Sequence, residues 1–264
     1  MNAPRSYVWR SVWRGAAGIV TAVILWETFA RSGIFSRALT PELKAIAVTL
    51  YSLIADGSMV KNAAFTLWRV LLGLFVASVI GVPLGMLMAR YRAWERFWLP
   101  LVSVLMPIPT LAWVPLFILW FGIGDLATTL VVTYAATFPM IYNTWTGVRS
   151  VNPIWVRAAV SMGAGQHAIF RKVVFPGSMP YIITGLRLAF GRAWIAVIGA
   201  ELLASPTWGV GRVIFDAKEF LDSEVMLAAL VVIGAMGLLF ERVVFQKLER
   251  YTVTRWGMLA PPRV

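Results

Sequence analysis

Long apolar segments recur along the chain and restrict its fold more than any other feature. A hydrocarbon layer of roughly 30 Å needs about 20 residues to be crossed as a helix. Backbone polar groups inside that layer must be hydrogen-bonded within the segment itself. Six segments lie near Trp13–Ala30, Phe65–Ala89, Phe97–Phe121, Leu126–Trp145, Tyr181–Ala204 and Val225–Phe245. They predict an all-α polytopic membrane protein with about six transmembrane helices.

The composition supports a membrane protein and excludes several other classes. Of the 264 residues, 59% are hydrophobic and 14% are charged, whereas soluble domains carry about a quarter charged residues. The net charge of +12 is typical of Lys and Arg gathered at a cytoplasmic face, so we expect no nucleic-acid partner. The chain has no cysteine, which excludes disulfides and thiolate metal sites, and the single histidine, His167, makes no metal site.

The basic residues also orient the segments. If the sides alternate along the chain, fifteen of the 24 Lys and Arg residues fall on the side of the N-terminus and six on the other. The excess predicts that both termini are cytoplasmic. The first segment resembles a signal peptide, but no small-x-small cleavage site follows the run Gly15–Trp26, so we favour an uncleaved helix. On the outer side, Pro41 to Gly57 has the spacing of an amphipathic helix.

A polar stretch, Trp155 to Pro180, separates the fourth and fifth segments. Asn152 and Pro153 before it form a typical helix start, which predicts a helix from Pro153 to Met162. Gly163-Ala164-Gly165 supplies the positive φ that ends such a helix.

A second short helix is predicted from Gln166 to Val174, after which Pro176 and Pro180 redirect the chain into the membrane. Such a segment fits either a helix at the lipid surface or a docking site for a partner protein. Ala158 and Ala159 carry little side-chain bulk, which favours the close approach of a partner protein.

The spacing of this stretch resembles the EAA loop of ABC importer permeases. Ala-Ala, three residues, Gly, nine residues and Val-x-Phe-Pro follow one another from Ala158 to Pro176. The family pattern begins with Glu, where this sequence has Arg157, and the change indicates an acidic partner at that position. The stretches Pro107–Asp125, Phe138–Val151 and Gly185–Ser205 are similar to the nitrate, sulfonate and taurine permease subfamily.

The resemblance implies a type I ABC importer permease in the bacterial inner membrane. Its partners would be a cytoplasmic ATPase dimer, a second permease subunit, expected to be a second copy, a solute-binding protein outside, and membrane lipid. Residues 1–61 would form an N-terminal region, 62–245 the permease core with a coupling loop at 152–177, and 246–264 a cytoplasmic tail. The residues implied in ATPase coupling are Arg157, Ala158, Ala159, Gly163, Gly165 and Pro176.

The chain has no Gly-x-x-x-x-Gly-Lys-Ser/Thr phosphate loop, so it is expected to be no enzyme itself and to have no cofactor of its own. ATP and Mg would be bound by the partner ATPase.

Charged residues and prolines inside the segments mark a candidate substrate path. Arg192 lies near mid-membrane, where charge costs roughly 2.5–3.5 kcal/mol, so it would either face an anionic substrate or hold helices together. Arg187 is nearer the cytoplasm and snorkels or pairs. Glu201, at the outer end of its segment, is a gate residue or a paired carboxylate. Pro107 and Pro109 free backbone carbonyls that can line a cavity.

Glu27 and Arg69 are interpreted as end-of-helix groups that are paired or directed outward. The subfamily and Arg192 favour a small anion such as a sulfonate, taurine or nitrate, with an aromatic carboxylate or a pyrimidine vitamin precursor as alternatives. A carrier or channel that needs no ATPase is a second class. An intramembrane enzyme is disfavoured, since no paired aspartates, His-Glu-x-x-His or Gly-x-Ser-x-Gly occur.

Overall fold

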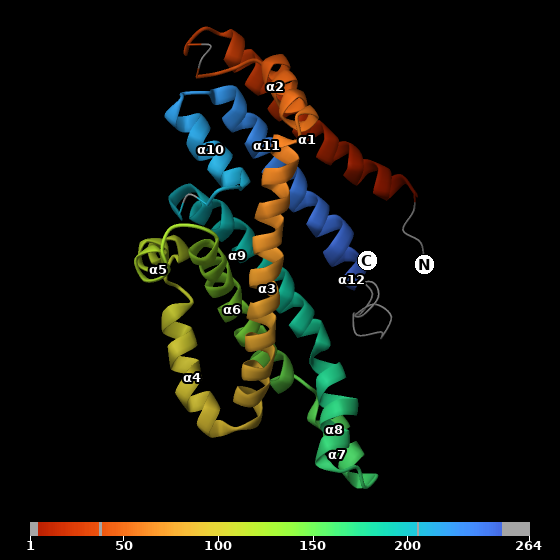
Figure 1. Cartoon of the computed structure of the whole chain (residues 1–264). Coiled ribbons are helices and arrows are strands. Elements are labelled where there is room, and N and C mark those ends of the chain that lie inside the picture. The colour runs from red at the N-terminus through yellow and green to blue at the C-terminus, as the bar shows by residue number, and fades with distance from the viewer. Residues whose placement is uncertain (1–4, 37–38, 205, 250–264) are drawn as a thin grey trace. The chain divides into compact units, whose positions relative to one another are not determined.

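The computed structural model describes residues 5–36, 39–204 and 206–249, and these residues form helices and connecting turns with no strand. The chain divides into two compact units. Unit 1 comprises residues 1–60 and 213–231, and unit 2 comprises residues 61–212 and 232–264. Figure 1 labels the helices along the chain.

Unit 1 is built on α1 (Arg5–Arg31) and α2 (Leu43–Ala55), with parts of α10 (Val210–Glu219) and α11 (Ser223–Leu239). The carboxylate of Glu27 accepts a hydrogen bond from the Leu43 backbone N–H at 3.0 Å and pairs with Arg31, which joins the end of α1 to the start of α2. The prediction of a paired end-of-helix group is therefore confirmed for Glu27. The expected helix between Pro41 and Gly57 is α2, and Gly57 follows it with φ +78°.

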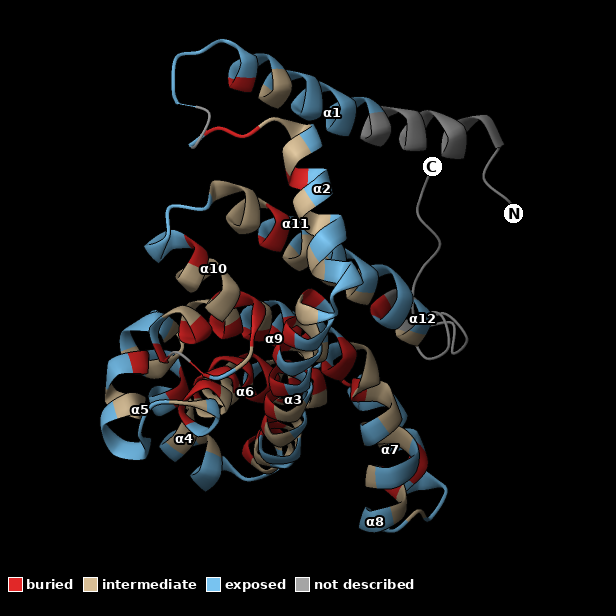
Figure 2. Ribbon diagram, turned by 45° about the horizontal axis from the view of Figure 1, so that its top comes forward, coloured by how far each residue is buried: buried red, intermediate tan, exposed pale blue. Residues whose placement is uncertain are grey.

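Unit 2 contains the helices that carry the candidate site. In chain order they are α3 (Ser58–Arg90), α4 (Arg92–Leu105), η1 (Thr110–Trp113), α5 (Val114–Phe121), α6 (Asp125–Arg149), α7 (Pro153–Ser161), α8 (Gln166–Ile169), η2 (Phe170–Val174), α9 (Phe175–Ala204), η3 (Phe240–Phe245) and α12 (Gln246–Glu249). Buried residues occur along almost the whole of α6, and Figure 2 shows them in red on α3, α6 and α9.

Small residues let α3 approach α6 closely. An added Cβ at Gly73 would lie 2.7 Å from Val132 Cγ1, and one at Gly85 would lie 2.7 Å from the Ile141 carbonyl oxygen. Lipid tails provide no hydrophobic drive between helices, so close packing of this kind is what holds membrane helices together. Val70, Ala77, Val132, Ala136, Met140, Ala189, Ala193 and Val197 fill the rest of this core.

Three helices among the described residues are long and apolar enough to cross a membrane: Ser58–Arg90, Gln166–Ala204 and Ser223–Phe245. They match the second, fifth and sixth predicted segments. The fourth segment forms α6, whose threonines and aromatic residues lower its hydropathy. Because α6 is buried against other helices, it does not need the composition of a lipid-facing span.

The third predicted segment is not one continuous span. Arg92–Leu105 and Thr110–Phe121 form two helices with a bend of 94° between them, and the pair counts as a fourth span if taken together. Pro107 and Pro109 lie in the bend. Two prolines separated by one residue remove two backbone N–H donors and fix φ twice, which favours a break in the helix at this point.

Candidate functional site

The segment between α6 and α9 begins with the helix that its capping residues predict. The Asn152 side-chain oxygen accepts a hydrogen bond from the Ile154 backbone N–H at 2.9 Å, and Pro153 occupies the first helical position. We call residues 152–177 the coupling segment, after the role that the resemblance implies.

Gly163 ends α7 in a left-handed conformation, with φ +77°. The Ala164 N–H donates to the Ala159 carbonyl at 3.0 Å and the Gly163 N–H donates to the Val160 carbonyl at 2.9 Å. These two bonds define a Schellman motif, which satisfies carbonyls that would otherwise lack partners. The structural prediction for Gly163 is confirmed, whereas Gly165 has φ −71°, a conformation open to any residue.

The second helix of the coupling segment does not stop before the membrane segment. Residues Gln166–Ala204 form one helix of 39 residues, in which η2 is a π-turn where the Phe175 N–H donates to the Phe170 carbonyl. The prediction that Pro176 and Pro180 redirect the chain is wrong, because both lie within α9. The π-turn widens the helix just before Pro176 and so gives its ring room that a regular α-helix would not.

The coupling residues differ in how open they are to a partner. Arg157 and Ala158 are exposed, but Ala159 is buried within the coupling segment, so only the first alanine of the pair is available for contact. Large apolar side chains are exposed beside it, at Ile154 and Met162, four residues to either side of Ala158. Sequence reasoning did not single these out, although the i, i+4 spacing around Ala158 would have found them.

Arg192, Pro107 and Pro109, three of the five predicted path residues, lie close together in unit 2. The Arg192 Nη1 atom lies 3.5 Å from the carbonyl oxygen of Met106, which belongs to the peptide bond before Pro107. Met106 follows the last residue of α4, where helix carbonyls lack partners along the chain. Arg192, Pro107 and Pro109 are all exposed in the single chain.

Arg187 is engaged differently. Its guanidinium forms an ion pair with Glu241 of η3, in which Arg187 Nε lies 3.3 Å from Glu241 Oε2. The pair joins α9 to the end of the last apolar segment. Arg187 is the side chain that the sequence predicts to lie nearer the cytoplasm than Arg192.

Glu201 lies apart from the Arg192 group, in a polar cluster that we define as Asn62, Thr66, Arg69, Asp125 and Glu201. Its members are buried except for Asp125, whose side chain is exposed. The Arg69 side chain is 1% exposed and that of Glu201 is 0% exposed, and Arg69 Nη1 lies 2.6 Å from Glu201 Oε1. Arg69 also binds Asp125 and donates to the Trp208 carbonyl at 2.6 Å.

The same polar cluster fixes the turn after α9. Glu201 accepts from the Gly211 N–H at 2.8 Å and from the Thr66 hydroxyl at 2.9 Å, and Asn62 accepts from the Gly209 N–H at 2.7 Å. The interpretation of Arg69 as an end-of-helix group is wrong, since α3 begins at Ser58 and Arg69 lies about three turns into the helix. The pairing was expected, but its partners were not.

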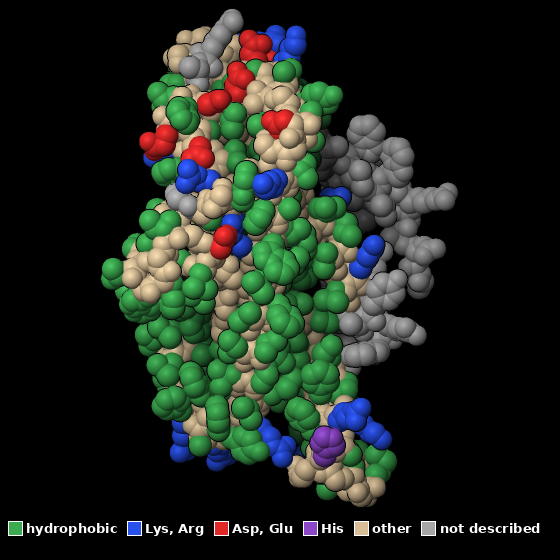
Figure 3. All heavy atoms as spheres, viewed as in Figure 1, with side chains coloured by type: hydrophobic (Ala, Val, Ile, Leu, Met, Phe, Trp, Pro, Cys, Tyr) green, Lys and Arg blue, Asp and Glu red, His purple; other side chains and the backbone are tan. Residues whose placement is uncertain are grey.

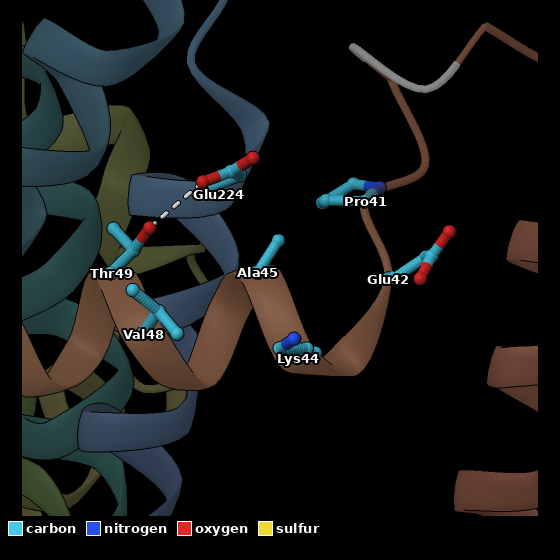
Figure 4. A pocket seen from close by; sticks show the side chains of 7 residues that line it. All are labelled: Pro41, Glu42, Lys44, Ala45, Val48, Thr49 and Glu224. Carbon is cyan, nitrogen blue, oxygen red and sulfur yellow. Dashed lines mark hydrogen bonds between the residues drawn. The ribbon is translucent and has the colours of Figure 1, made fainter.

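Unit 1 contains a separate hollow of about 450 Å³ (Figure 4). The Thr49 hydroxyl donates to Glu224 at 2.8 Å on one side, and Glu42 and Lys44 line it on the other. Its lining mixes a cation with carboxylates, and we assign it no ligand. Across residues 5–36, 39–204 and 206–249, no group of three or more His, Cys, Asp or Glu side chains is placed to hold a metal ion.

Residues 81–246 match the family model described as the binding-protein-dependent transport system inner membrane component. The chain belongs to this family. This permease is 36% identical over 238 residues to a putative ABC transporter permease of Methanocaldococcus jannaschii, a match that covers 89% of each chain. It is 31% identical to the taurine transport system permease TauC of Escherichia coli, over 88% of this chain and 86% of TauC.

A third relative is the bicarbonate transport system permease CmpB of Synechococcus elongatus, 33% identical over 86% of this permease and 85% of CmpB. Among solved structures, the methionine ABC transporter MetNI in an inward-facing conformation matches with a TM-score of 0.61 and 20% identity, over 74% of this permease and 96% of that chain. The fold is therefore that of a type I ABC importer permease.

Proposed function

We propose that this permease forms the translocation path of an ATP-driven importer for a small anion in the inner membrane. Two copies would pair around the path, an ATPase dimer would bind the two coupling segments, and a solute-binding protein would deliver the substrate from outside. Family membership supports the transport role, because the family model matches residues 81–246, which include the coupling segment and Arg192.

The division of labour follows from what the chain contains. It has no phosphate-loop motif, so ATP and Mg would be bound by the partner. The exposed apolar and basic side chains of α7 provide a surface that a soluble protein can cover. The helix that follows α7 runs without a break from Gln166 to Ala204 and so connects the coupling segment to the membrane segment of α9.

The choice of a small anion rests on the relatives and on one group of side chains. TauC and CmpB are named for taurine and bicarbonate transport, and a relative in Bacillus subtilis is named as a putative permease for aliphatic sulfonates. In this permease, Arg192 is exposed beside Pro107 and Pro109, and a cation at membrane depth that faces a water-filled path attracts anions.

Uptake into proteoliposomes tests the proposal. The permease, its ATPase and its solute-binding protein would be reconstituted together, and uptake of labelled taurine, an alkanesulfonate, nitrate and bicarbonate would be followed with and without ATP. We expect ATP-dependent uptake of one of these anions. Uptake that proceeds without the ATPase would instead support a carrier or channel. If none of these four solutes is taken up, and the same proteoliposomes take up a labelled aromatic carboxylate or pyrimidine, the assignment to sulfonates and small inorganic anions would be overturned.

The role of Arg192 has its own test. Replacing Arg192 with Gln is expected to lower uptake about tenfold or more while the melting temperature stays unchanged, since the side chain is exposed and makes one weak contact at 3.5 Å. Arg192→Lys keeps the charge and should restore part of the uptake. Normal uptake by Arg192→Gln would remove Arg192 from the path.

A further inference from the structure

A hollow of about 360 Å³ lies at the root of the coupling segment. Its walls come from the end of α3, the end of α6, α7, α8 and the π-turn η2, all of which belong to unit 2. Apolar side chains such as Met86, Val148 and Val156 form most of the lining. Arg90, Arg157 and Gln166 are the polar side chains that line it.

The two arginines of this hollow have no carboxylate partner among the described residues. Arg90 Nε contacts the neighbouring Tyr91 hydroxyl at 3.3 Å. Within the part of the chain that the structure describes, Arg157 forms no ion pair. The nearby carboxylate of Glu95 is taken by Arg149. The sequence has no Asp or Glu between Asp125 and Glu201, so the coupling segment cannot supply one.

Basic side chains gather at the end of unit 2 that carries the coupling segment. Figure 3 shows blue Lys and Arg side chains at the end of unit 2 that carries α7 and α8, with no red Asp or Glu side chain beside them on the face shown. A concave site lined by one sign of charge with apolar walls concentrates its electric field and raises the local concentration of opposite charge.

The shape of α7 favours a protein side chain as the source of that opposite charge. Exposed Ala158 follows Arg157 directly and leaves the backbone open to close approach, and exposed Ile154 and Met162 supply apolar contact on either side. Guanidinium groups bind carboxylates through paired, charge-assisted hydrogen bonds, and two of them can grip one carboxylate from both sides.

We propose that this hollow receives an Asp or Glu side chain of the partner ATPase, held between Arg157 and Arg90. The assignment rests on the proposed function, in which the coupling segment binds the ATPase. It adds the chemistry of the contact: the position that carries Glu in the EAA pattern carries the cation here, and the carboxylate lies on the ATPase.

Affinity between the purified permease and its ATPase tests the contact. Arg157→Gln and Arg90→Gln should each weaken ATPase binding about tenfold or more, which corresponds to 1.4 kcal/mol per tenfold. The wild-type affinity should fall as NaCl is raised from 50 to 500 mM, and Arg157→Gln should depend less on salt. Arg92→Gln is the matched control, because it removes the same charge from an exposed position outside the hollow.

Chemical cross-linking identifies the partner atom directly. In the assembled transporter, Arg157→Lys places an amine that a zero-length carbodiimide joins only to a carboxylate in contact with it. Mass spectrometry should then find residue 157 linked to an Asp or Glu of the ATPase, and Arg92→Lys should give no such link.

The outcomes separate this inference from the proposed function. If wild-type permease binds the ATPase but Arg157→Gln binds equally well and no link forms, the hollow is not the contact and the docking role still stands. If Arg157→Gln instead loses bound phosphatidylglycerol in native mass spectrometry with ATPase binding unchanged, the occupant is a lipid and the inference is overturned. If the wild type binds no ATPase at all, the proposed function itself fails.

Discussion

The stability of this permease depends strongly on one buried side chain, that of Arg69. A buried charge is tolerated only when it is paired and hydrogen-bonded, and Arg69 meets Glu201, Asp125 and the Trp208 carbonyl at once. Removing one partner of a buried pair leaves the other charge uncompensated, which costs more than the pair contributes. Glu201 is fully enclosed, so no solvent can replace the guanidinium.

Arg69→Met is therefore expected to lower the free energy of unfolding by roughly 3–5 kcal/mol. Denaturant unfolding of the detergent-solubilised protein, followed by circular dichroism, measures the change. The double variant Arg69→Met with Glu201→Met removes both charges and should recover a large part of the loss. If Arg69→Met unfolds like the wild type, the buried pair does not exist in the folded protein.

At the scale of whole helices, the contact between α3 and α6 depends on glycine. Gly85→Ala would place a Cβ 2.7 Å from both the Ile141 carbonyl oxygen and the Thr144 Cβ, and backbone cannot move aside cheaply. We expect a loss of about 1–3 kcal/mol, typical of overpacking. Gly234→Ala in α11 meets nothing within 4 Å and should be neutral or slightly stabilising. Equal melting temperatures for the two variants would contradict this packing.

The turn that ends α7 makes a second prediction at the same scale. Gly163 has φ +77° and its N–H donates to Val160, and proline can satisfy neither condition. Gly163→Pro should reorient α8 relative to α7, so that the ATPase still hydrolyses ATP but uptake falls. Uptake and hydrolysis measured in the same proteoliposomes give the ratio, and membrane insertion checks that the variant is made. Gly165→Ala, at an ordinary backbone conformation, should keep the wild-type ratio.

Local features of the chain could be predicted from the sequence, and long-range pairings could not. Asn152, Pro153 and Gly163 act on neighbours within five residues, so their roles follow from the sequence alone. The wrong prediction that Pro176 redirects the chain also has a local cause. The helix continues through Pro176 because a π-turn precedes it, and no residue type indicates a π-turn. Arg69 and Glu201 are 132 positions apart, and a single sequence does not show which charged helix residues meet.

The boundary of α3 explains why Arg69 was misplaced. The apolar run begins near Phe65, but the helix begins at Ser58, and two polar residues of its first turns, Asn62 and Thr66, are buried in the polar cluster rather than exposed at a membrane surface. Hydropathy measures transfer to lipid, so it misses helical residues whose polar groups are satisfied by other helices. The same reason explains why α6, which matches the fourth predicted segment, is not among the helices that are apolar enough to cross a membrane.

For the whole molecule, the orientation predicted from basic residues is open to a simple measurement, because the chain contains no cysteine. Ser161→Cys in α7 and Ser32→Cys after α1 each introduce one exposed thiol. In intact cells, a membrane-impermeant maleimide should label Ser32→Cys and leave Ser161→Cys unlabelled until the membrane is permeabilised. The opposite pattern would place the coupling segment outside and exclude contact with a cytoplasmic ATPase.

The helix Gln166–Ala204 has a mechanical consequence. Arg192 lies 26 residues beyond Gln166 on the same rod, a separation of about 39 Å. A tilt of about 5° at one end of such a rod displaces the other by about 3 Å. The π-turn at Phe170–Val174 lies between the two ends, as does Pro180 within α9, so the flexibility of the helix at these points limits how much of the tilt reaches Arg192. Substitutions that convert the π-turn to regular α-helix would change how far Arg192 moves when the Gln166 end of the helix tilts, although they alter neither Gln166 nor Arg192.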